Sequence, residues 1–199
     1  GGKVTHHDKL DLRKRLAELD AELDCNLAGE YGITPKSYGS KSAYEQAFNQ
    51  WKDSHQPFHW FVEFYGVMNA GGFDVIIGNP PYVEYVKVKK DYTIRGYDTV
   101  DCGNLYAYVV ERSMNLLDIT GRIGLIVPIS LTAAQRMAAL QKLLLTTTSI
   151  LYLSNFALRP AALFPGVMQR LSICIGAKGK ANLAYTTDYI TWYAEERPT

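Results

Sequence analysis

The sequence predicts an α/β fold that is preceded by a helical segment. From residue 73 onward, short apolar and β-branched runs alternate with stretches in which apolar residues recur every three or four positions. Before residue 57 only the helical spacing is clear. Strands that alternate with helices form parallel sheets with right-handed crossovers, and we expect this sheet to finish in an antiparallel or mixed edge.

The front section, up to about Gln56, is predicted to be a helical spacer. A first helix is indicated by leucines placed among charged residues, and it ends near Gly29–Gly32. These leucines are Leu10, Leu12, Leu16, Leu19 and Leu23. Residues 35–41 form a loop, and a second, short helix runs from Ser42 towards Asp53. The predicted segments are therefore 1–56 and 57–199.

The second segment begins with aromatic residues. Residues 58–64 are predicted to form a strand, and Gly71 and Gly72 force a turn. Residues 73–78 are apolar and β-branched, as in a strand that is buried on both faces. Two successive prolines then end the strand, because proline cannot donate a hydrogen bond to a neighbouring strand.

The remaining elements follow in alternation. A polar loop spans residues 83–103, a helix covers 105–117, and Gly121 is expected to stop that helix. Later elements are a strand at 123–128, a helix at 133–145 and strands at 150–156, 170–175 and 183–185.

The tetrapeptide Asn79-Pro80-Pro81-Tyr82 carries the clearest chemical signal, because it directly follows a predicted strand. In open α/β sheets, ligands bind outside the carboxyl ends of the strands. The Asn79 side-chain oxygen and the Pro80 carbonyl could accept both hydrogens of an exocyclic amino group and aim its lone pair at a methyl donor. Tyr82 offers a flat face for an extruded base. The alternative is a proline-rich turn without chemistry.

Residues 73–83, FDVIIGNPPYV, resemble the catalytic motif of gamma-class amino methyltransferases. Three further segments narrow the resemblance to the methylase region of type IIG restriction–modification enzymes and BREX phage-exclusion methylases. They are PFHWFVEF at 57–64, NLYAYVVERSMNLLDITGRIGLIVPISL at 104–131 and LFPGVMQRLSICI at 163–175. The resemblance implies a site-specific DNA methyltransferase that transfers a methyl group from S-adenosyl-L-methionine (AdoMet) to the N6 of a flipped-out adenine.

The resemblance also implies roles for single residues. It makes Asn79, Pro80 and Tyr82 catalytic, and it places Pro81 and Phe164 in the pocket of the substrate base. Phe164 could equally be a core aromatic before a Pro-Gly turn. The implied fold is the C-terminal half of a Rossmann-like AdoMet-dependent methyltransferase sheet, so 57–199 is read as a partial catalytic domain.

The sequence departs from this family at the donor site. Nothing in residues 1–56 fits a strand that leads into a glycine-rich turn, so no AdoMet-binding residue can be named. A sequence-reading domain and a nuclease signature are not recognised either. We therefore expect a fragment of a longer protein, inactive by itself, whose partners are double-stranded DNA and the rest of the parent chain. An uncovered sheet edge and apolar face would favour self-association.

Other sequence features limit the possible partners, cofactors and localisation. Lys87, Lys89, Lys90 and Arg95 could contact DNA phosphates, although a solvated loop is the plainer reading. The formal net charge of +1 argues against a free-standing nucleic-acid binder. The three cysteines and four histidines show no metal-ligand spacing, so we expect no metal. No membrane span or signal peptide is recognised, and the widely spaced cysteines favour a reducing cytoplasm.

Two other functions stay open on the sequence alone. A protein-glutamine or RNA methyltransferase can share Asn-Pro-Pro-Tyr, and a non-catalytic DNA-binding or scaffold module could retain the motif without turnover. A cytosine-C5 mechanism through Cys102 is disfavoured, because that chemistry needs a positioned thiolate.

Overall fold

The computed structural model describes residues 5–164, 166–191 and 193 of the chain. The chain divides into two compact units, Gly1–Met68 and Asn69–Thr199. Residues 57–68 therefore belong with the helical front section rather than with the sheet.

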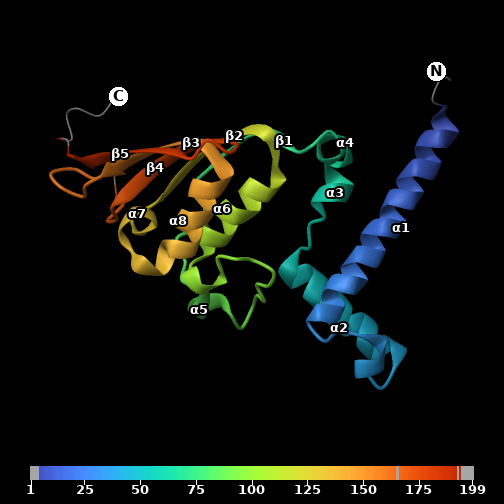
Figure 1. The fold of residues 1–199 in the computed structure, drawn as a ribbon. Helices are drawn as coiled ribbons and strands as arrows, with labels where there is room; N and C mark the ends of the chain where they lie inside the picture. Colours follow the sequence, from blue (N-terminus) through green and yellow to red (C-terminus); the bar gives the residue numbers. More distant parts are fainter. Residues whose placement is uncertain (1–4, 165, 192, 194–199) are drawn as a thin grey trace. The chain divides into compact units, whose positions relative to one another are not determined.

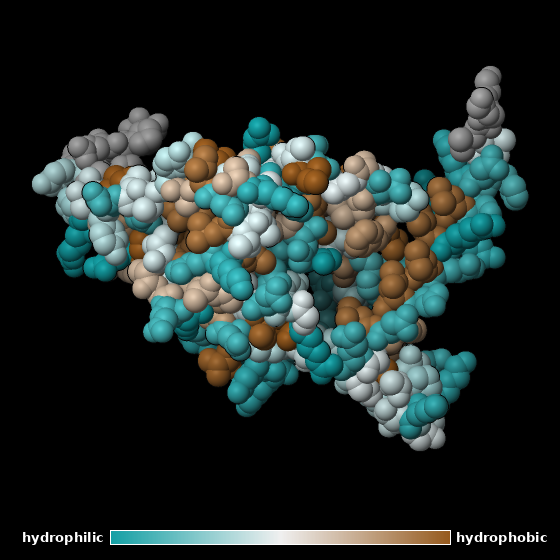
Figure 2. All heavy atoms as spheres, viewed as in Figure 1, coloured by the Kyte–Doolittle hydropathy of each residue, from teal (hydrophilic) through white to brown (hydrophobic). Residues whose placement is uncertain are grey.

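The first unit is helical throughout its described secondary structure (Figure 1). Its long helix α1, His6–Glu30, begins with a capping box in which Thr5 and Asp8 satisfy each other's backbone N–H groups. Apolar side chains lie exposed along α1 (Figure 2). The other elements are the 3₁₀ turn η1 (Pro35–Ser37), α2 (Lys41–His55), α3 (Trp60–Glu63) and α4 (Tyr65–Asn69). Both predicted helices are confirmed, and α1 ends at Glu30, within the predicted end at Gly29–Gly32.

The strand predicted at residues 58–64 is wrong, because this segment contains α3. The Trp60 and Phe64 rings stack with their centroids 5.7 Å apart. Residues four apart lie on the same side of a helix, so this stacking favours helical over extended backbone. High aromatic content is typical of strands, but here ring packing between residues close in the sequence decides the conformation.

A buried carboxylate joins three helices of this unit. Asp24 of α1 is 1 % exposed. One of its oxygens lies 2.5 Å from Nζ of Lys52 in α2, and the other lies 2.8 Å from Nε2 of His59, the residue before α3. A buried charge needs such partners, so the three side chains fix the helices to each other.

The second unit is built on a five-stranded mixed sheet with the order β1-β2-β4-β3-β5 (Figure 1). β1 is parallel to β2, β4 is antiparallel to both of its neighbours, and β3 is parallel to β5. The strands are β1 (Phe73–Gly78), β2 (Leu117–Pro128), β3 (Thr148–Phe156), β4 (Leu171–Lys178) and β5 (Leu183–Ile190). The α/β prediction with a mixed edge is confirmed.

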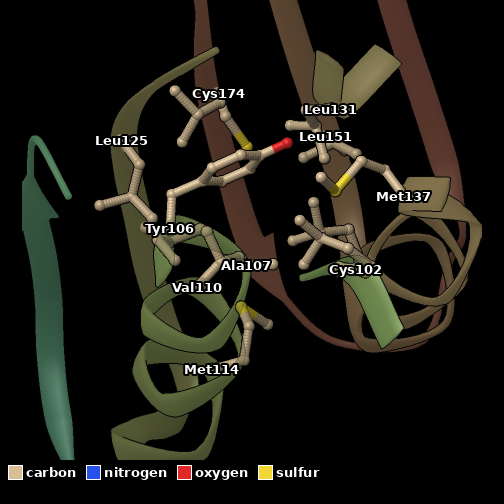
Figure 3. Close-up of a cluster of buried hydrophobic side chains, with 14 of the residues drawn as sticks. Cys102, Tyr106, Ala107, Val110, Met114, Leu125, Leu131, Met137, Leu151 and Cys174 are labelled. Carbon is tan, nitrogen blue, oxygen red and sulfur yellow. The ribbon is translucent and has the colours of Figure 1, made fainter. Parts of the chain in front are cut away.

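One face of this sheet is covered by helices and forms the core. α6 (Leu105–Leu116) and α8 (Ala138–Thr147) lie on it (Figure 1). The Tyr106 ring is fully buried at the centre of the cluster, among aliphatic and sulfur-containing side chains (Figure 3). Its hydroxyl lies 2.8 Å from Oγ of Ser130, which satisfies the only polar atom of the side chain.

The opposite face of the same sheet is open. One row of paired residues crosses all five strands: Ile77, Gly124, Ile175, Tyr152 and Tyr185. Directly paired residues point to the same face, and the four large side chains of this row are exposed, with Ile77 at 77 %. The prediction that β1 is buried on both faces is therefore wrong. β1 lies at the edge of the sheet, and nothing within the described part of the second unit covers its second face.

Two predicted helix boundaries also need correction. The helix expected to stop at Gly121 ends at Leu116, and Gly121 lies inside β2. Nζ of Lys178 donates to the carbonyls of Met114 and Leu117, at 2.8 and 2.7 Å, and thereby satisfies this helix end.

The helix predicted at 133–145 is divided into three pieces. They are α7 (Ser130–Ala133), the 3₁₀ turn η3 (Gln135–Met137) and α8. Ala134 has extended backbone angles, which interrupts the helix. Two short elements precede them in the polar loop, α5 (Tyr85–Val88) and η2 (Val100–Cys102).

The turn before β1 requires glycine. Gly71 and Gly72 have φ of 118° and 125°, a region that other residues rarely adopt. A Cβ on Gly72 would lie 2.5 Å from the Leu116 carbonyl oxygen and 2.8 Å from the Asp118 backbone nitrogen. The backbones at the starts of β1 and β2 therefore touch at this residue.

Candidate functional site

The carboxyl ends of the parallel strands define one edge of the sheet. β1 ends at Gly78 and β2 at Pro128, and Leu171 at the start of β4 pairs with Pro128. β3 ends at Phe156, which also pairs with Leu171. The segment after β1 and the loop between β3 and β4 therefore emerge at the same edge, although they are about 80 residues apart in the sequence.

Asn79-Pro80-Pro81-Tyr82 leaves β1 at this edge. Asn79 and Pro81 are exposed, Pro80 is buried and Tyr82 is half-buried. The Tyr82 ring packs against the core cluster. Its hydroxyl is close enough to hydrogen-bond both the Asn79 side-chain oxygen and the Ile126 carbonyl, the latter at 3.0 Å. Burial raises the pKa of the Tyr82 phenol, so it stays protonated and can donate.

The Tyr82 hydroxyl holds one acceptor of the motif, the Asn79 side-chain oxygen, in place. The Asn79 oxygen accepts from Tyr82 and keeps a second lone pair for another donor. No donor from the described chain reaches the Pro80 carbonyl. Neither oxygen is thus saturated by donors of the described chain, and proline restricts the backbone that carries one of them.

The chain that follows the motif is fixed to the start of α6. The Leu105 N–H donates to the Val83 carbonyl and the Tyr85 N–H to the Gly103 carbonyl, both at 2.8 Å. Asn104 caps α6 with its side-chain oxygen and donates to Glu84 with its amide nitrogen at 3.1 Å. Tyr82 is therefore held both through its own hydroxyl and through the residues beside it.

Glu84 also forms a two-bond ion pair with Arg136 of η3, at 2.6 and 2.9 Å. The bonds from Arg136, opposed by burial, lower the pKa of the Glu84 carboxyl. Three residues beside the motif are not revealed as site residues by the sequence alone: Glu84, Asn104 and Arg136. Glu84 and Asn104 lie close to recognisable motifs, but no local pattern reveals Arg136, because it lies 52 residues from its partner.

The loop after α5 is ordered by contacts with α6. The Tyr85 hydroxyl donates to the Tyr92 carbonyl and accepts from the Ile94 N–H. Buried Glu111 of α6 accepts from the backbone N–H groups of Asp98 and Thr99 and from the Thr99 hydroxyl, at 2.6–3.0 Å. The four cationic side chains of the predicted DNA contacts are exposed on this segment: Lys87, Lys89, Lys90 and Arg95.

Phe164 lies in the loop that joins β3 to β4 and is 37 % exposed. The fold thus brings it to the edge that carries Asn79 and Tyr82. Among the ring pairs of the described residues, Phe164 contacts neither Tyr82 nor another aromatic.

A donor site is not found in the described part of the first unit. AdoMet binding in an α/β sheet needs a glycine-rich turn after a strand, whereas residues 6–69 form helices and their connections. The described residues of the first unit therefore do not fit AdoMet. No set of three His, Cys, Asp or Glu side chains that could hold a metal lies within the described chain. None of the described helices is long and apolar enough to cross a membrane.

Comparison with known proteins places these features in a family. A protein of Methanocaldococcus jannaschii, described as a type II restriction enzyme and methyltransferase, is 32 % identical over 115 residues. That match covers 58 % of this chain and 10 % of the relative. The chain is thus far shorter than this relative.

Solved structures that match part of this chain include two DNA complexes. The DrdV–DNA complex is 15 % identical with a TM-score of 0.49, and the match covers 68 % of this chain and 16 % of that one. The ATP-dependent Type ISP restriction-modification enzyme LlaBIII bound to DNA is 21 % identical with a TM-score of 0.41, over 60 % of this chain and 10 % of that one.

The profile of the Eco57I restriction-modification methylases matches residues 11–164. This range spans well over half of the chain and includes most of α1, the Asn-Pro-Pro-Tyr segment and strands β1, β2 and β3. The chain belongs to the Eco57I restriction-modification methylase family.

Proposed function

We propose that this chain provides the target-base side of a DNA adenine-N6 methyltransferase. The observation that carries the proposal is the position of Asn79-Pro80-Pro81-Tyr82 at the carboxyl end of β1, where ligands bind in open α/β sheets. Family membership supports methyl transfer as the reaction. Because the chain spans only 10 % of its relative, the activity belongs to the longer protein.

The proposed role of Asn79 and Pro80 is to orient the amino group. The lone pair of an adenine amino group is delocalised into the ring, which makes the nitrogen a poor nucleophile. When the Asn79 side-chain oxygen and the Pro80 carbonyl accept its two hydrogens, the nitrogen becomes pyramidal and its lone pair points in one direction. Positioning of this kind can contribute much of the rate without a strong general base.

Tyr82, Pro81 and Phe164 are proposed to hold a base that has left the duplex. An adenine inside a helix cannot present its amino group to this edge, so the base must be flipped out. Stacking on an aromatic ring contributes about 1–3 kcal/mol per base. The bonded hydroxyl of Tyr82 fixes the ring before the base arrives, which lowers the entropic cost of stacking.

The methyl donor proposed for the reaction is AdoMet, as the family implies. Since the described residues do not fit it, no residue of this chain is assigned to the donor. The remainder of the parent protein is proposed to hold it, and the isolated chain is expected to bind no AdoMet and to transfer no methyl group.

Double-stranded DNA is the proposed partner. Lys87, Lys89, Lys90 and Arg95 are exposed on the segment that follows the motif, so they can reach phosphates beside the flipped base. The wider role proposed is modification of host DNA within a type IIG restriction–modification or phage-exclusion system in the cytoplasm.

The test is methyl transfer by the full-length protein. Asn79→Ala removes one of two acceptors and is expected to lower the transfer rate at least about 100-fold, by analogy with the loss of a single stabilising hydrogen bond at other active sites. Donor binding and the melting temperature should stay near wild type. Asn115→Ala, at an exposed position of α6, is the matched control and should leave the rate unchanged.

The outcomes distinguish the alternatives. A near-normal rate for Asn79→Ala would rule out the proposed orientation of the amino group. Transfer to a protein or RNA substrate, and not to DNA, would identify the other methyltransferase classes. DNA binding without any transfer by the wild type would identify a non-catalytic module.

A further inference from the structure

A second feature of the sheet edge is a cleft with no part in the chemistry described so far. Its volume is about 330 Å³, and it is lined by Ala157, Leu158, Arg159, Arg170 and Tyr189. This volume is at the lower end of the ~300–1,000 Å³ of ligand clefts. Arg159 and Arg170 flank the β3–β4 loop, and Tyr189 lies near the end of β5.

Two guanidinium groups make this cleft a site for an anion. Neither arginine forms an ion pair with another residue of the described chain. Guanidinium groups bind phosphate oxygens through pairs of parallel N–H bonds. The cleft therefore combines a concave shape with uncompensated positive charge.

Arg170 is held in a defined position. Its guanidinium carbon lies over the Tyr189 ring, 5.8 Å from the ring centre, as in a cation–π contact. Its carbonyl accepts a hydrogen bond of 3.1 Å from the Ile129 N–H, just after β2. This contact uses the face of the ring and occupies none of the guanidinium N–H groups as a hydrogen-bond donor, so an anion can accept from them.

The position of the cleft indicates which anion it takes. Neighbouring strands lie about 4.8 Å apart, and the order β1-β2-β4-β3-β5 puts the ends of β3 and β5 three and four strands from the end of β1. The cleft thus lies about 14–19 Å along the edge from Asn79. Phosphates of one DNA strand advance about 3.4 Å per base pair, so this span corresponds to roughly four to six base pairs.

We propose that Arg159, Arg170 and Tyr189 form a phosphate-binding cleft that holds the DNA backbone about four to six base pairs from the target adenine. The inference rests on the proposed DNA substrate. It adds a second contact point at the far side of the sheet edge, separate from the lysines of the α5 segment. Two separated contacts fix the direction in which the duplex crosses the edge.

The salt dependence of DNA binding by the full-length protein tests this site. Each phosphate contact contributes about 0.9 to the slope of log K against log salt concentration. The double variant Arg159→Gln/Arg170→Gln is expected to lower the slope by about 0.9–1.8 and the affinity at 0.1 M salt by about 10- to 100-fold. Arg159→Lys/Arg170→Lys keeps both charges and should keep most of the slope, which excludes misfolding as the cause.

Two controls test where on the protein the phosphate contact lies and whether the cleft binds DNA phosphates specifically. Lys180→Gln removes a charge at the opposite edge of the sheet, after β4, and should leave the slope unchanged. Methylphosphonate links four to six base pairs from the target should weaken binding by the wild type and not by the double glutamine variant. Competition by inorganic phosphate at millimolar concentration, with no effect of the methylphosphonates, would identify a free-anion site and overturn the proposal.

The results separate this inference from the proposed function. If the wild type methylates DNA and the glutamine variant keeps its full salt slope, the cleft proposal falls and the methyltransferase proposal stands. If the slope falls as expected but no DNA is methylated, the cleft stands and the catalytic proposal falls. A wild type that binds no DNA overturns both.

Discussion

The two faces of the sheet are made by the same strands and have opposite environments. Leu125 of β2 points to the covered face and is 2 % exposed, whereas Ile77 of the neighbouring β1 points to the open face and is 77 % exposed. Both residues are large and aliphatic. The comparison shows that an apolar run predicts a strand but does not determine what covers it, because burial depends on elements elsewhere in the chain.

The largest effect is expected on the covered face. Leu151→Ala removes a side chain that is 2 % exposed, and we expect a loss of about 2–5 kcal/mol in the free energy of unfolding. Leu183→Ala makes the same change at an exposed position of β5 on the open face and should cost less than about 0.5 kcal/mol. Urea denaturation of both variants measures the difference in the free energy of unfolding. Equal losses would show that the two faces contribute equally to stability.

The next largest effect on the free energy of unfolding is expected at Glu111 of α6, the helix that lies on the covered face. Glu111 fixes the loop that precedes this helix. Glu111→Ala leaves the N–H groups of Asp98 and Thr99 without their acceptor. Bonds to charged groups contribute about 1.5–3 kcal/mol, so a loss of that size is expected. Hydrogen exchange at Thr99 should accelerate more than exchange in β2; unchanged protection of Thr99 would show that other contacts order the loop.

A smaller, pH-dependent effect is expected for Glu84. Its folded-state pKa is lowered, so its contribution is present above the unfolded pKa, near 4.3, and is lost as the pH falls through the folded pKa. The pair is half exposed, which limits the contribution at pH 7 to about 1 kcal/mol or less. Glu84→Gln should therefore be less stable than wild type at pH 7 and equal to it at pH 2–3, in thermal melts across that range. A constant difference at all pH values would contradict this assignment.

The smallest change in unfolding is expected on the open face itself. Ile77→Ser should alter the free energy of unfolding by no more than about 0.5 kcal/mol, because the side chain already contacts solvent. Self-association of the 199-residue chain should decrease, since the substitution interrupts an exposed apolar row beside a free strand edge. Light scattering measures the change, with Val109→Ser on the outer surface of α6 as control. A wild type that stays monomeric at high concentration would contradict the association.

Much of the fold was predictable from local patterns. The predicted α/β fold preceded by a helical segment is confirmed, and the chain belongs to a methylase family, as the resemblance implied. Strands such as Phe73–Gly78 and helices such as Leu105–Leu116 have clear periodicity, and α1 has an equally clear spacing of leucines. The segment at 58–64 failed because aromatic residues are common in strands, while here the rings pack along a helix.

The candidate site was predictable only where its residues are contiguous. Asn79 to Tyr82 form one motif, so their place at the strand end followed from the sequence, and their roles remain predictions. Arg136 contacts Glu84 across 52 residues, and Arg159, Arg170 and Tyr189 come together only through the order of the strands. Such contacts depend on the packing of distant elements, which no spacing along the chain encodes.

The close approach at Gly72 fixes the position at which β1 begins, so the length of β1 determines where Asn79 lies. At one end the backbones of β1 and β2 touch, and at the other end the chain turns into Asn79. Six residues at about 3.3 Å each separate the two points. One inserted residue would reverse the sides to which the β1 side chains point, and two would carry Asn79 about 6.6 Å beyond the edge. The length of this strand is therefore as constrained as the chemistry of the motif that follows it.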